Sequence, residues 1–307
     1  MSSHFFIIES YSTIVSFIIE SSFIDFKYKL IIVSKIKKEN GNFGDFSTPI
    51  VMGVLNVTTD SFYDGGKYLS EIEIAKQIRK IDDEGAKIID VGASSSRPGS
   101  TPVSEKIEIN RLLPTIELIK KNSPNLKISI DTFRSNVARQ CIKNGADMIN
   151  DISAGEKDKK MFKTIAELNV PYIMMHMKGN SLTMQKNPNY DNIINEIFKF
   201  FEKKIKTLNS LGFNKIIIDP GFGFGKTLEH NYEILRNLSE FKKINLPILV
   251  GASRKSMIYN LLEITADQAL NGTSIINTIA LNNGANLLRV HDVKEAIECI
   301  NITNQLK

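Results

Sequence analysis

From residue 50 onward, short apolar runs alternate with longer segments in which apolar residues recur every three or four positions. The short runs have the length of β-strands, and the longer segments have the spacing of amphipathic helices. Strands that are apolar on both faces and alternate with helices are typical of a parallel sheet covered by helices. The predicted strands are residues 50–55, 87–91, 127–131, 147–150, 171–175, 215–219, 247–251 and 286–290, and the clearest helical segments are 71–86, 105–121 and 192–212.

A short internal repeat supports this interpretation. Gly-Ala follows a helical segment and directly precedes a predicted strand at Gly85, Gly145 and Gly284, and Gly212 has the equivalent place before the sixth strand. Glycine just after a helix adopts the left-handed conformation at little cost. Strand–helix units that repeat eight times in about 250 residues predict an α/β fold of the closed (β/α)8 or TIM barrel type. An open doubly wound sheet is disfavoured, because no G-x-G-x-x-G turn follows the first predicted strand.

Residues 1–34 differ from the rest of the chain and are rich in Phe, Ile and Ser. Glu9, Glu20 and Asp25 keep the apolar runs well below the roughly 18 residues of a membrane span. We interpret residues 1–34 as an N-terminal extension, either disordered or the product of an upstream translation start, and residues 35–307 as a single barrel domain. Organelle targeting is disfavoured, since transit peptides are rich in arginine and this segment has none.

Composition adds limits on partners and compartment. The apolar fraction of 42% suffices for a large core, and the net charge of +5 comes from lysines spread along the chain. This distribution favours a solvated surface over a nucleic-acid face, and it is compatible with a small anionic substrate. Cys141 and Cys299 show neither metal-ligand spacing nor a disulfide framework, which suits the cytoplasm. We expect no membrane association.

Polar residues gather at the C-terminal ends of the predicted strands, the side on which barrel enzymes react. They are Asn56, Ser94 to Arg97, Asp131, Asn150, Asp151, His176, Asp219, Ser253 to Lys255, Arg289 and His291. Two acids, an amide and a lysine that converge on a small pocket would form an array of fixed donors and acceptors. Arg97, Arg289 and His291 would supply cationic groups suited to phosphate.

Structural explanations compete with these functional ones. Asp151 could equally be a helix cap or part of an Asx turn, and for His176 we favour a hydrogen-bonded core histidine over a ligand. The turn explanation fits Asp131 and Asp219 less well, because Asp219 precedes Pro-Gly and Asp131 precedes a segment in which Ser135 is the better cap.

The stretch IIIDPGFGFGKT, residues 216–227, resembles a phosphate-binding loop only superficially. A P-loop requires glycine where Pro220 stands, and proline has no backbone N–H to offer a phosphate. Asp219 therefore becomes the functional candidate of this stretch. The two longest loops, 56–70 and 92–104, are rich in Gly, Ser and Asp, and we expect them to close over a substrate.

Seven linked stretches carry a resemblance to a known family. They are MGVLNVTTDSFYDGG (52–66), IIDVGASSSRPGS (88–100), SIDTFRSNVA (129–138), GADMINDISAG (145–155), IIIDPGFGFGKT (216–227), GASRKSMI (251–258) and LLRVHDV (287–293). The chain resembles the dihydropteroate synthase family. The resemblance implies a TIM barrel that joins 6-hydroxymethyl-7,8-dihydropterin diphosphate to 4-aminobenzoate, releases diphosphate, forms a homodimer and is a target of sulfonamides.

The resemblance also assigns roles to individual residues. The pterin would contact Asp131, Asn150, Met175, Asp219, Phe222, Gly251 and Lys255. The 4-aminobenzoate would contact Ser96, Arg97, Pro98, Phe224, Ser253 and Lys255. The diphosphate would contact Asn56, Arg97, Arg289 and His291, with Mg²⁺ near Asn56. Asp131, Lys255 and Arg97 would carry catalysis, and no strong general base is needed because the arylamine is already a nucleophile.

The sequence departs from the family pattern in the two long loops. Thr59 stands where the family usually has proline, and Ala93 and Ser94 stand where it has Gly-Glu. Ser96 replaces threonine and keeps the hydroxyl. These departures bear on aminobenzoate affinity and sulfonamide sensitivity. Two alternatives remain open at this point: a methyltetrahydrofolate methyltransferase on a related barrel, and a non-catalytic pterin-binding paralogue.

Overall fold

The computed structural model describes residues 46, 48–57, 67–93, 103–179 and 188–306, without the side chains of residues 67–70. The chain divides into the units Met1–Asp45 and Phe46–Lys307, and the described residues belong to the second. Residues 1–34, Thr59, Ser94, Ser96, Arg97 and Pro98 lie outside them, so the expectations for these residues stay predictions.

Eight parallel strands form the sheet that the sequence predicts, in the order β6-β5-β4-β3-β2-β1-β8-β7. Their bounds are β1 Ile50–Asn56, β2 Ile88–Gly92, β3 Lys127–Asp131, β4 Met148–Asp151, β5 Tyr172–Met175, β6 Ile216–Asp219, β7 Leu249–Val250 and β8 Leu287–Val290. A parallel bridge between Ile218 and Ile248 joins the two ends of this order, and the Ile218 N–H donates to the Pro247 carbonyl at 3.0 Å. The sheet therefore closes into the predicted barrel.

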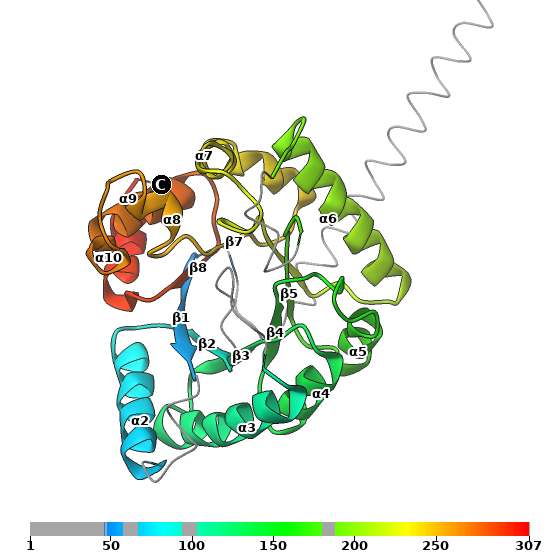
Figure 1. Ribbon diagram of the computed structural model, residues 1–307, viewed down its shortest axis with the longest axis vertical. Coiled ribbons are helices and arrows are strands. Elements are labelled where there is room, and N and C mark those ends of the chain that lie inside the picture. The colour runs from blue at the N-terminus through cyan, green and yellow to red at the C-terminus, as the bar shows by residue number, and fades with distance from the viewer. Residues whose placement is uncertain (1–45, 47, 58–66, 94–102, 180–187, 307) are drawn as a thin grey trace, which may run out of the picture. The chain divides into compact units, whose positions relative to one another are not determined.

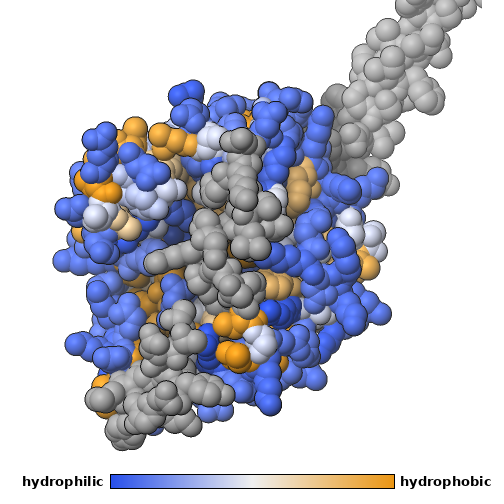
Figure 2. All heavy atoms as spheres, in the orientation of Figure 1, coloured by the Kyte–Doolittle hydropathy of each residue, from blue (hydrophilic) through white to orange (hydrophobic). Residues whose placement is uncertain are grey.

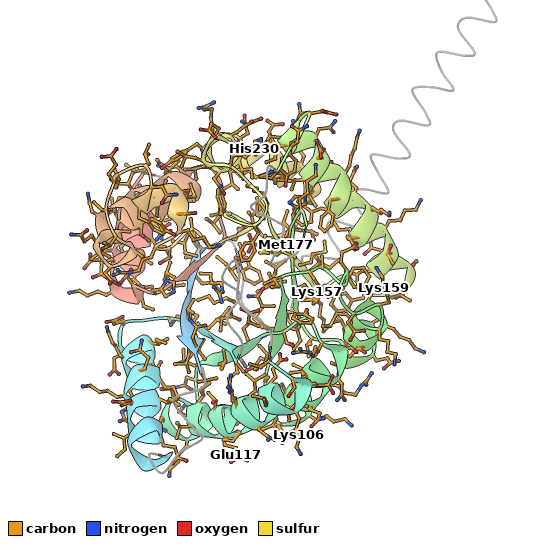
Figure 3. The ribbon with its side chains drawn as sticks, viewed as in Figure 1. Lys106, Glu117, Lys157, Lys159, Met177 and His230 are labelled. Atoms are coloured by element: carbon orange, nitrogen blue, oxygen red, sulfur yellow. The ribbon has the colours of Figure 1, made fainter. Side chains whose placement is uncertain are left out.

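Helices cover the outside of this ring of strands (Figure 1). The α-helices are α2 Lys67–Asp83, α3 Glu105–Asn122, α4 Ser135–Lys143, α5 Met161–Leu168, α6 Ile193–Ser210, α7 Leu228–Arg236, α8 Ser256–Tyr259, α9 Leu270–Asn282 and α10 Val293–Asn304, with 3-10 helices η2 Leu238–Ile244 and η3 Ala266–Gln268. Lys106 and Glu117 of α3 point away from the barrel (Figure 3), and the face seen in Figure 2 is mostly hydrophilic. Among the helices of the described ranges, none combines the length and apolarity that crossing a bilayer requires.

The repeated glycines have the predicted conformation. The φ angles are 98° at Gly85, 99° at Gly145, 76° at Gly212 and 104° at Gly284. Each value lies in the left-handed region, where a residue without a Cβ is favoured. The Gly-Ala signal thus marks tight turns from a helix into the next strand.

Each strand presents alternate residues to two different environments. One set, including Val51, Ile89, Ile128, Ile149 and Ile218, belongs to the hydrophobic core shared with the helices. The alternate set faces the barrel interior and begins with apolar residues such as Val54, Ile88, Met148, Ile173 and Ile217, all buried. Nearer the C-terminal strand ends the same inward alternation continues with Asn56, Asp131, Asn150, Asp219 and Arg289. The sheet thus gathers the predicted polar residues at one end of the barrel.

Candidate active site

Asp131 and Asn150 lie side by side at the ends of β3 and β4. The parallel register pairs Asp131 with Asn150 on one side and with Gly92 of β2 on the other. The Arg289 Nη2 group donates to Asp131 Oδ2 at 3.2 Å. Burial, and then the charge of Asp90, raises the pKa of Asp131 to about 7, although the Arg289 guanidinium opposes this shift. Asp131 is therefore a carboxyl group that titrates near neutrality.

Asp219 ends β6, and its carboxylate organises the turn that follows. Its Oδ1 accepts a hydrogen bond from the Gly221 N–H at 2.7 Å. Burial raises the pKa of Asp219, and the Lys255 ammonium is the main opposing influence. Gly221 has φ +75°, and a Cβ there would lie 2.0 Å from the His176 carbonyl oxygen. Glycine is thus required because the turn passes directly against the chain that leaves β5.

Lys255 reaches the same turn from the segment after β7. Its Nζ donates to the Phe222 carbonyl at 2.7 Å and lies 4.6 Å from the centroid of the Phe224 ring. Burial lowers the pKa of Lys255 to about 8, and Asp219 opposes this shift. The Phe222 ring itself is 1% exposed and belongs to the hydrophobic core. The Phe222 carbonyl thus makes the contact with Lys255, and the expected contact of the buried Phe222 ring with a pterin stays a prediction.

Lys226 is buried beneath the glycine-rich turn and supports it through hydrogen bonds. Its side chain is 3% exposed, and its Nζ donates to the carbonyls of Gly221 at 2.8 Å, Phe224 at 3.0 Å and His176 at 3.3 Å. The ammonium also contacts His176 Nδ1 at 3.1 Å. Burial, followed by the Lys226 charge, holds the pKa of His176 well below its usual value. The expected core histidine is confirmed, because neutral His176 is buried and hydrogen-bonded.

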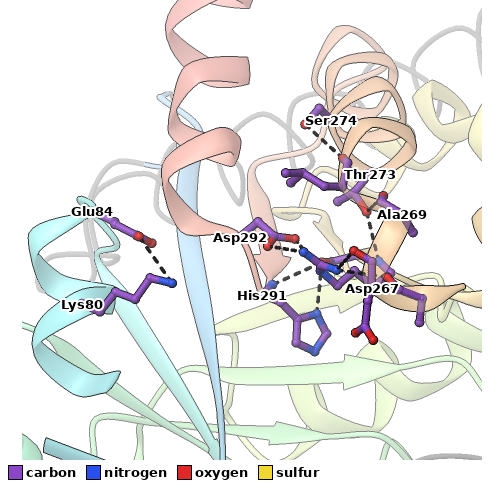
Figure 4. A network of polar contacts seen from close by, with 12 residues as sticks. Lys80, Glu84, Asp267, Ala269, Thr273, Ser274, His291 and Asp292 are labelled. Carbon is purple, nitrogen blue, oxygen red and sulfur yellow. Dashed lines mark hydrogen bonds and ion pairs between the residues drawn. The ribbon is translucent and has the colours of Figure 1, made fainter. Parts of the chain in front are cut away.

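His291 and Ser253 form a pair just beyond the ends of β8 and β7, and Figure 4 shows the His291 ring with its polar contacts. The Ser253 Oγ lies 3.1 Å from His291 Nδ1 and accepts from the His291 N–H at 3.2 Å. Burial, and then the Arg289 charge, lowers the pKa of His291 to about 4. Without a bound anion His291 is therefore mostly neutral at neutral pH, in contrast to the expected cation, and it can offer an anion an N–H donor.

Arg254 stabilises the segment after β7, a role that the sequence did not predict for it. It has φ 53°, a costly conformation for a residue with a side chain. Its Nε and Nη2 both donate to the Asp292 carboxylate at 2.8 Å, and its Nη1 donates to the Ala266 and Asp267 carbonyls. This fork fixes the backbone between Ser253 and Lys255, so that both can point to the barrel end.

Two alternatives from the sequence are settled by the hydrogen bonds. The Asp151 carboxylate accepts from the Ser153 N–H and hydroxyl, the Gly155 N–H and the Tyr172 hydroxyl. Asp151 therefore has the structural role, in the loop after β4. The expectation that Ser135 caps the next helix is wrong, because α4 begins at Ser135 and the Ser135 N–H donates to Asp158.

The second long loop is anchored where it leaves β2. Ala93 is fully buried, and its carbonyl accepts from Arg111 Nη1 of α3 at 2.7 Å. Because this bond is made to the backbone, it holds the chain in place whichever side chain residue 93 carries. Alanine can therefore stand at this position, where the family usually has glycine.

Asn56 is the residue proposed to bind a metal, and its surroundings suit one. A Cβ built on Gly92 would lie 3.4 Å from Asn56 Oδ1 and 3.6 Å from Asp131 Oδ2. An amide oxygen and a carboxylate oxygen thus border the same point, and both are ligands that Mg²⁺ accepts. Among the described residues, no three His, Cys, Asp or Glu side chains form a metal-binding group. Asn56 fits a Mg²⁺ that keeps mostly water and substrate oxygens as ligands.

Comparison with known proteins places this geometry in a class. Residues 52–291 match a family model described as pterin binding enzyme. A dihydropteroate synthase of Escherichia coli is 44% identical over 260 residues, which are 84% of this chain and 92% of that protein. The dihydropteroate synthase of Yersinia pestis, solved with a sulfonamide drug, superposes with a TM-score of 0.80 at 39% identity, over 86% of this chain and 96% of that one.

A third solved structure agrees with these two. The Xanthomonas albilineans dihydropteroate synthase, solved with 4-aminobenzoic acid, has a TM-score of 0.78 at 34% identity, over 85% of this chain and 94% of that one. The chain therefore belongs to the pterin-binding enzymes and, within them, to the dihydropteroate synthases.

Proposed function

We propose that the protein condenses 6-hydroxymethyl-7,8-dihydropterin diphosphate with 4-aminobenzoate, giving 7,8-dihydropteroate and diphosphate. The observation that carries this proposal is the bond between Arg289 and Asp131 at 3.2 Å. It places an anion-binding guanidinium within hydrogen-bond distance of a carboxyl group suited to a pterin. A pterin and the diphosphate attached to it can therefore bind side by side.

The pterin is recognised by protein donors and acceptors that complement the donors and acceptors on its edge. Its edge presents an amide N–H, an amine and ring nitrogens, so Asp131 and Asp219 accept from it, while Asn150 and Lys255 complete the pattern. Met175, 2% exposed on the inner face of β5, flanks the ring, and Gly251 leaves room beside the Arg289 stem, since a Cβ there would lie 3.7 Å from Arg289 Cβ.

The diphosphate binds to Arg289, to the neutral N–H of His291 and to Arg97. Asn56 would hold Mg²⁺, which when bound neutralises the charge that the diphosphate carries away. The 4-aminobenzoate lies against Phe224, Ser253 and Lys255, together with Ser96, Arg97 and Pro98 of the second loop. In this proposed arrangement the amine of one substrate would lie beside the methylene carbon of the other.

The reaction breaks the bond between the pterin methylene carbon and the diphosphate oxygen, and the electron pair leaves with the diphosphate. The cation that remains is delocalised into the pterin ring, and Asp131 stabilises its positive charge when ionised. The arylamine nitrogen then donates its lone pair to the methylene carbon and loses a proton to solvent. No strong general base is required because an arylamine is nucleophilic when neutral.

The proposal is tested by measuring diphosphate release from the purified chain. Release that requires both the pterin diphosphate and 4-aminobenzoate supports the synthase. Pterin binding without release identifies the non-catalytic paralogue, and methyl transfer from methyltetrahydrofolate identifies the methyltransferase. Either of the last two results refutes the synthase.

The pH dependence of kcat/KM for the pterin diphosphate is expected to be bell-shaped. Asp131 must be ionised to accept from the pterin, so activity falls as the pH drops below the Asp131 pKa of about 7. Lys255 must keep its proton, so activity also falls as the pH rises above the Lys255 pKa of about 8. Lys255→Arg should remove the alkaline limb, because arginine stays protonated. Steady-state rates between pH 5.5 and 9.5 check this, and a flat wild-type profile would contradict it.

His291→Ala is expected to weaken binding of the pterin diphosphate by about tenfold, the loss of one hydrogen bond to a charged group. The KM for 4-aminobenzoate should change less than that. Isothermal titration with each substrate measures the difference, with His230→Ala as the matched control. Equal losses for both substrates would remove His291 from the anion site.

Assembly and compartment extend the proposal. We infer a homodimer from the family resemblance, and exposed apolar residues on α9, with Ile275 52% and Ile279 39% exposed, are compatible with it. Light scattering on the purified chain decides between monomer and dimer. A cytoplasmic location and inhibition by sulfonamides complete the proposal. Diphosphate release from the purified chain, measured with and without a sulfonamide, tests the inhibition.

A further inference from the structure

One carboxylate inside the barrel bonds to two of the proposed substrate-binding residues. Asp90 lies in the middle of β2 and is 0% exposed. Its Oδ2 accepts from Asn150 Nδ2 at 3.0 Å and from Arg289 Nε at 2.7 Å. Its Oδ1 accepts from Ser129 Oγ at 2.6 Å. Asp90 therefore links β3, β4 and β8 at a point below the strand ends.

The bond to Asp90 fixes which end of the Asn150 amide faces a ligand. An ionised carboxylate accepts hydrogen bonds and cannot donate them. The amide must therefore turn its nitrogen toward Asp90, which leaves the Asn150 carbonyl oxygen for a donor elsewhere. A pterin edge that presents N–H groups needs this orientation. In the reversed amide the Asn150 NH2 group would face the pterin N–H groups, and two donors cannot form a hydrogen bond.

The same carboxylate fixes the plane of the Arg289 guanidinium. Asp90 holds Nε, and Asp131 holds Nη2 at 3.2 Å. A guanidinium carries five N–H donors in one plane, so two bonds on neighbouring nitrogens leave the remaining donors at a defined edge. That edge can bind a diphosphate without a rearrangement of the arginine.

A purely structural role would not require a charge at this position. The neighbouring inward residues Val54, Ile88 and Met148 show that apolar side chains fill the interior below the site. Buried ion pairs contribute little net stability compared with well-packed apolar residues. The carboxylate of Asp90 is better explained by what it holds in place.

We propose that Asp90 is a positioning residue that holds Asn150 for the pterin and Arg289 for the diphosphate. This inference rests on the proposed function, which assigns those two residues to the substrate. Asp90 acts through them, and the bond-breaking step itself is unchanged.

The test compares Asp90→Asn with the wild-type chain on two ligands, 6-hydroxymethyl-7,8-dihydropterin and its diphosphate. Asparagine keeps the shape of the aspartate side chain. It has only one acceptor oxygen, instead of two, for the groups that donate hydrogen bonds to Asp90. We expect the Kd of the unphosphorylated pterin to rise about tenfold and that of the diphosphate about 100-fold, because the second ligand also depends on Arg289. The KM for 4-aminobenzoate should stay within about twofold.

The titrations themselves separate positioning from simple destabilisation. A loss of folded protein lowers the number of binding sites and leaves the Kd of the remaining folded molecules unchanged. A misplaced Arg289 instead raises the Kd of the diphosphate more than that of the unphosphorylated pterin, with the number of sites unchanged.

Ser129→Ala is the matched control, since it removes the third donor to Asp90 and leaves the contacts with Asn150 and Arg289. It should change both Kd values by less than about threefold. Unchanged Kd values in Asp90→Asn, or equal losses for the two pterins, would overturn the proposal. So would failure of both Asp90→Asn and the smaller Asp90→Ser to fold. A wild-type chain that binds both pterins but releases no diphosphate would instead overturn the proposed reaction.

Discussion

Lys255→Ala is expected to lower kcat/KM by about 10²- to 10³-fold, the cost of losing one charged donor in a buried site. The ammonium donates to the Phe222 carbonyl at 2.7 Å and lies 4.6 Å from the Phe224 ring centroid. It therefore stands between the proposed places of the two substrates. Its removal also takes away the main influence that holds down the pKa of Asp219, so a second binding group is weakened at the same time.

Diphosphate release under saturating and limiting concentrations of each substrate measures the effect of Lys255→Ala. Both KM values should rise, because the lysine contacts both substrates. Lys243→Ala is the control: Lys243 lies in η2, its side chain is 67% exposed, and its ion pair with Glu240 is on the surface. It should leave the rate unchanged. A Lys255→Ala enzyme with near-normal kcat/KM would refute the assigned role.

Asp219→Asn is expected to weaken binding of the pterin diphosphate by about 100-fold. The Asp219 Oδ1 accepts the Gly221 N–H at 2.7 Å, and an asparagine oxygen can keep that bond and preserve the turn. The amide nitrogen then takes the place of the second carboxylate oxygen. It would face the donor edge of the pterin with another donor, which leaves buried polar groups unpaired.

Calorimetric titration with the pterin diphosphate measures this loss, and thermal unfolding verifies that the barrel stays intact. Asp147→Asn is the matched control, because Asp147 precedes β4 at the opposite end of the barrel and pairs with the half-exposed Lys127 at 3.2 Å. Its effect on affinity should be below about twofold. Equal affinities of Asp219→Asn and the wild type would mean that other residues, and not Asp219, bind the donor edge of the pterin.

The fold was predictable because its signals are local. Each strand is a short apolar run, and each helix shows its spacing within a single segment, so neither requires knowledge of distant residues. The Gly-Ala repeat marks helix ends by a backbone preference that is likewise local. The strand ends, and thus the ring of Asp131, Asn150 and Asp219, follow from the topology of parallel strands.

The sequence predicted which residues belong to the site but not how they contact one another. Arg289 was expected to carry charge for the diphosphate, but its bonds to Asp90 and Asp131 were not foreseen, because these residues are far apart along the chain. Asp90 was missed although a charged residue inside the apolar run IIDVG is a readable signal. Lys226 received no role of its own from the sequence, because its burial against the carbonyls of the turn is visible only in three dimensions.

The sequence by itself determined the barrel, the end of it that carries polar groups and the family, because these depend on local pattern and on residue identity. The tertiary structure decided the protonation states and the orientations. His291 is neutral, and Asp131 titrates near neutrality, because burial removes water from charged groups. Desolvation and the geometry of hydrogen bonds between distant strands exist only once the chain has closed into the barrel.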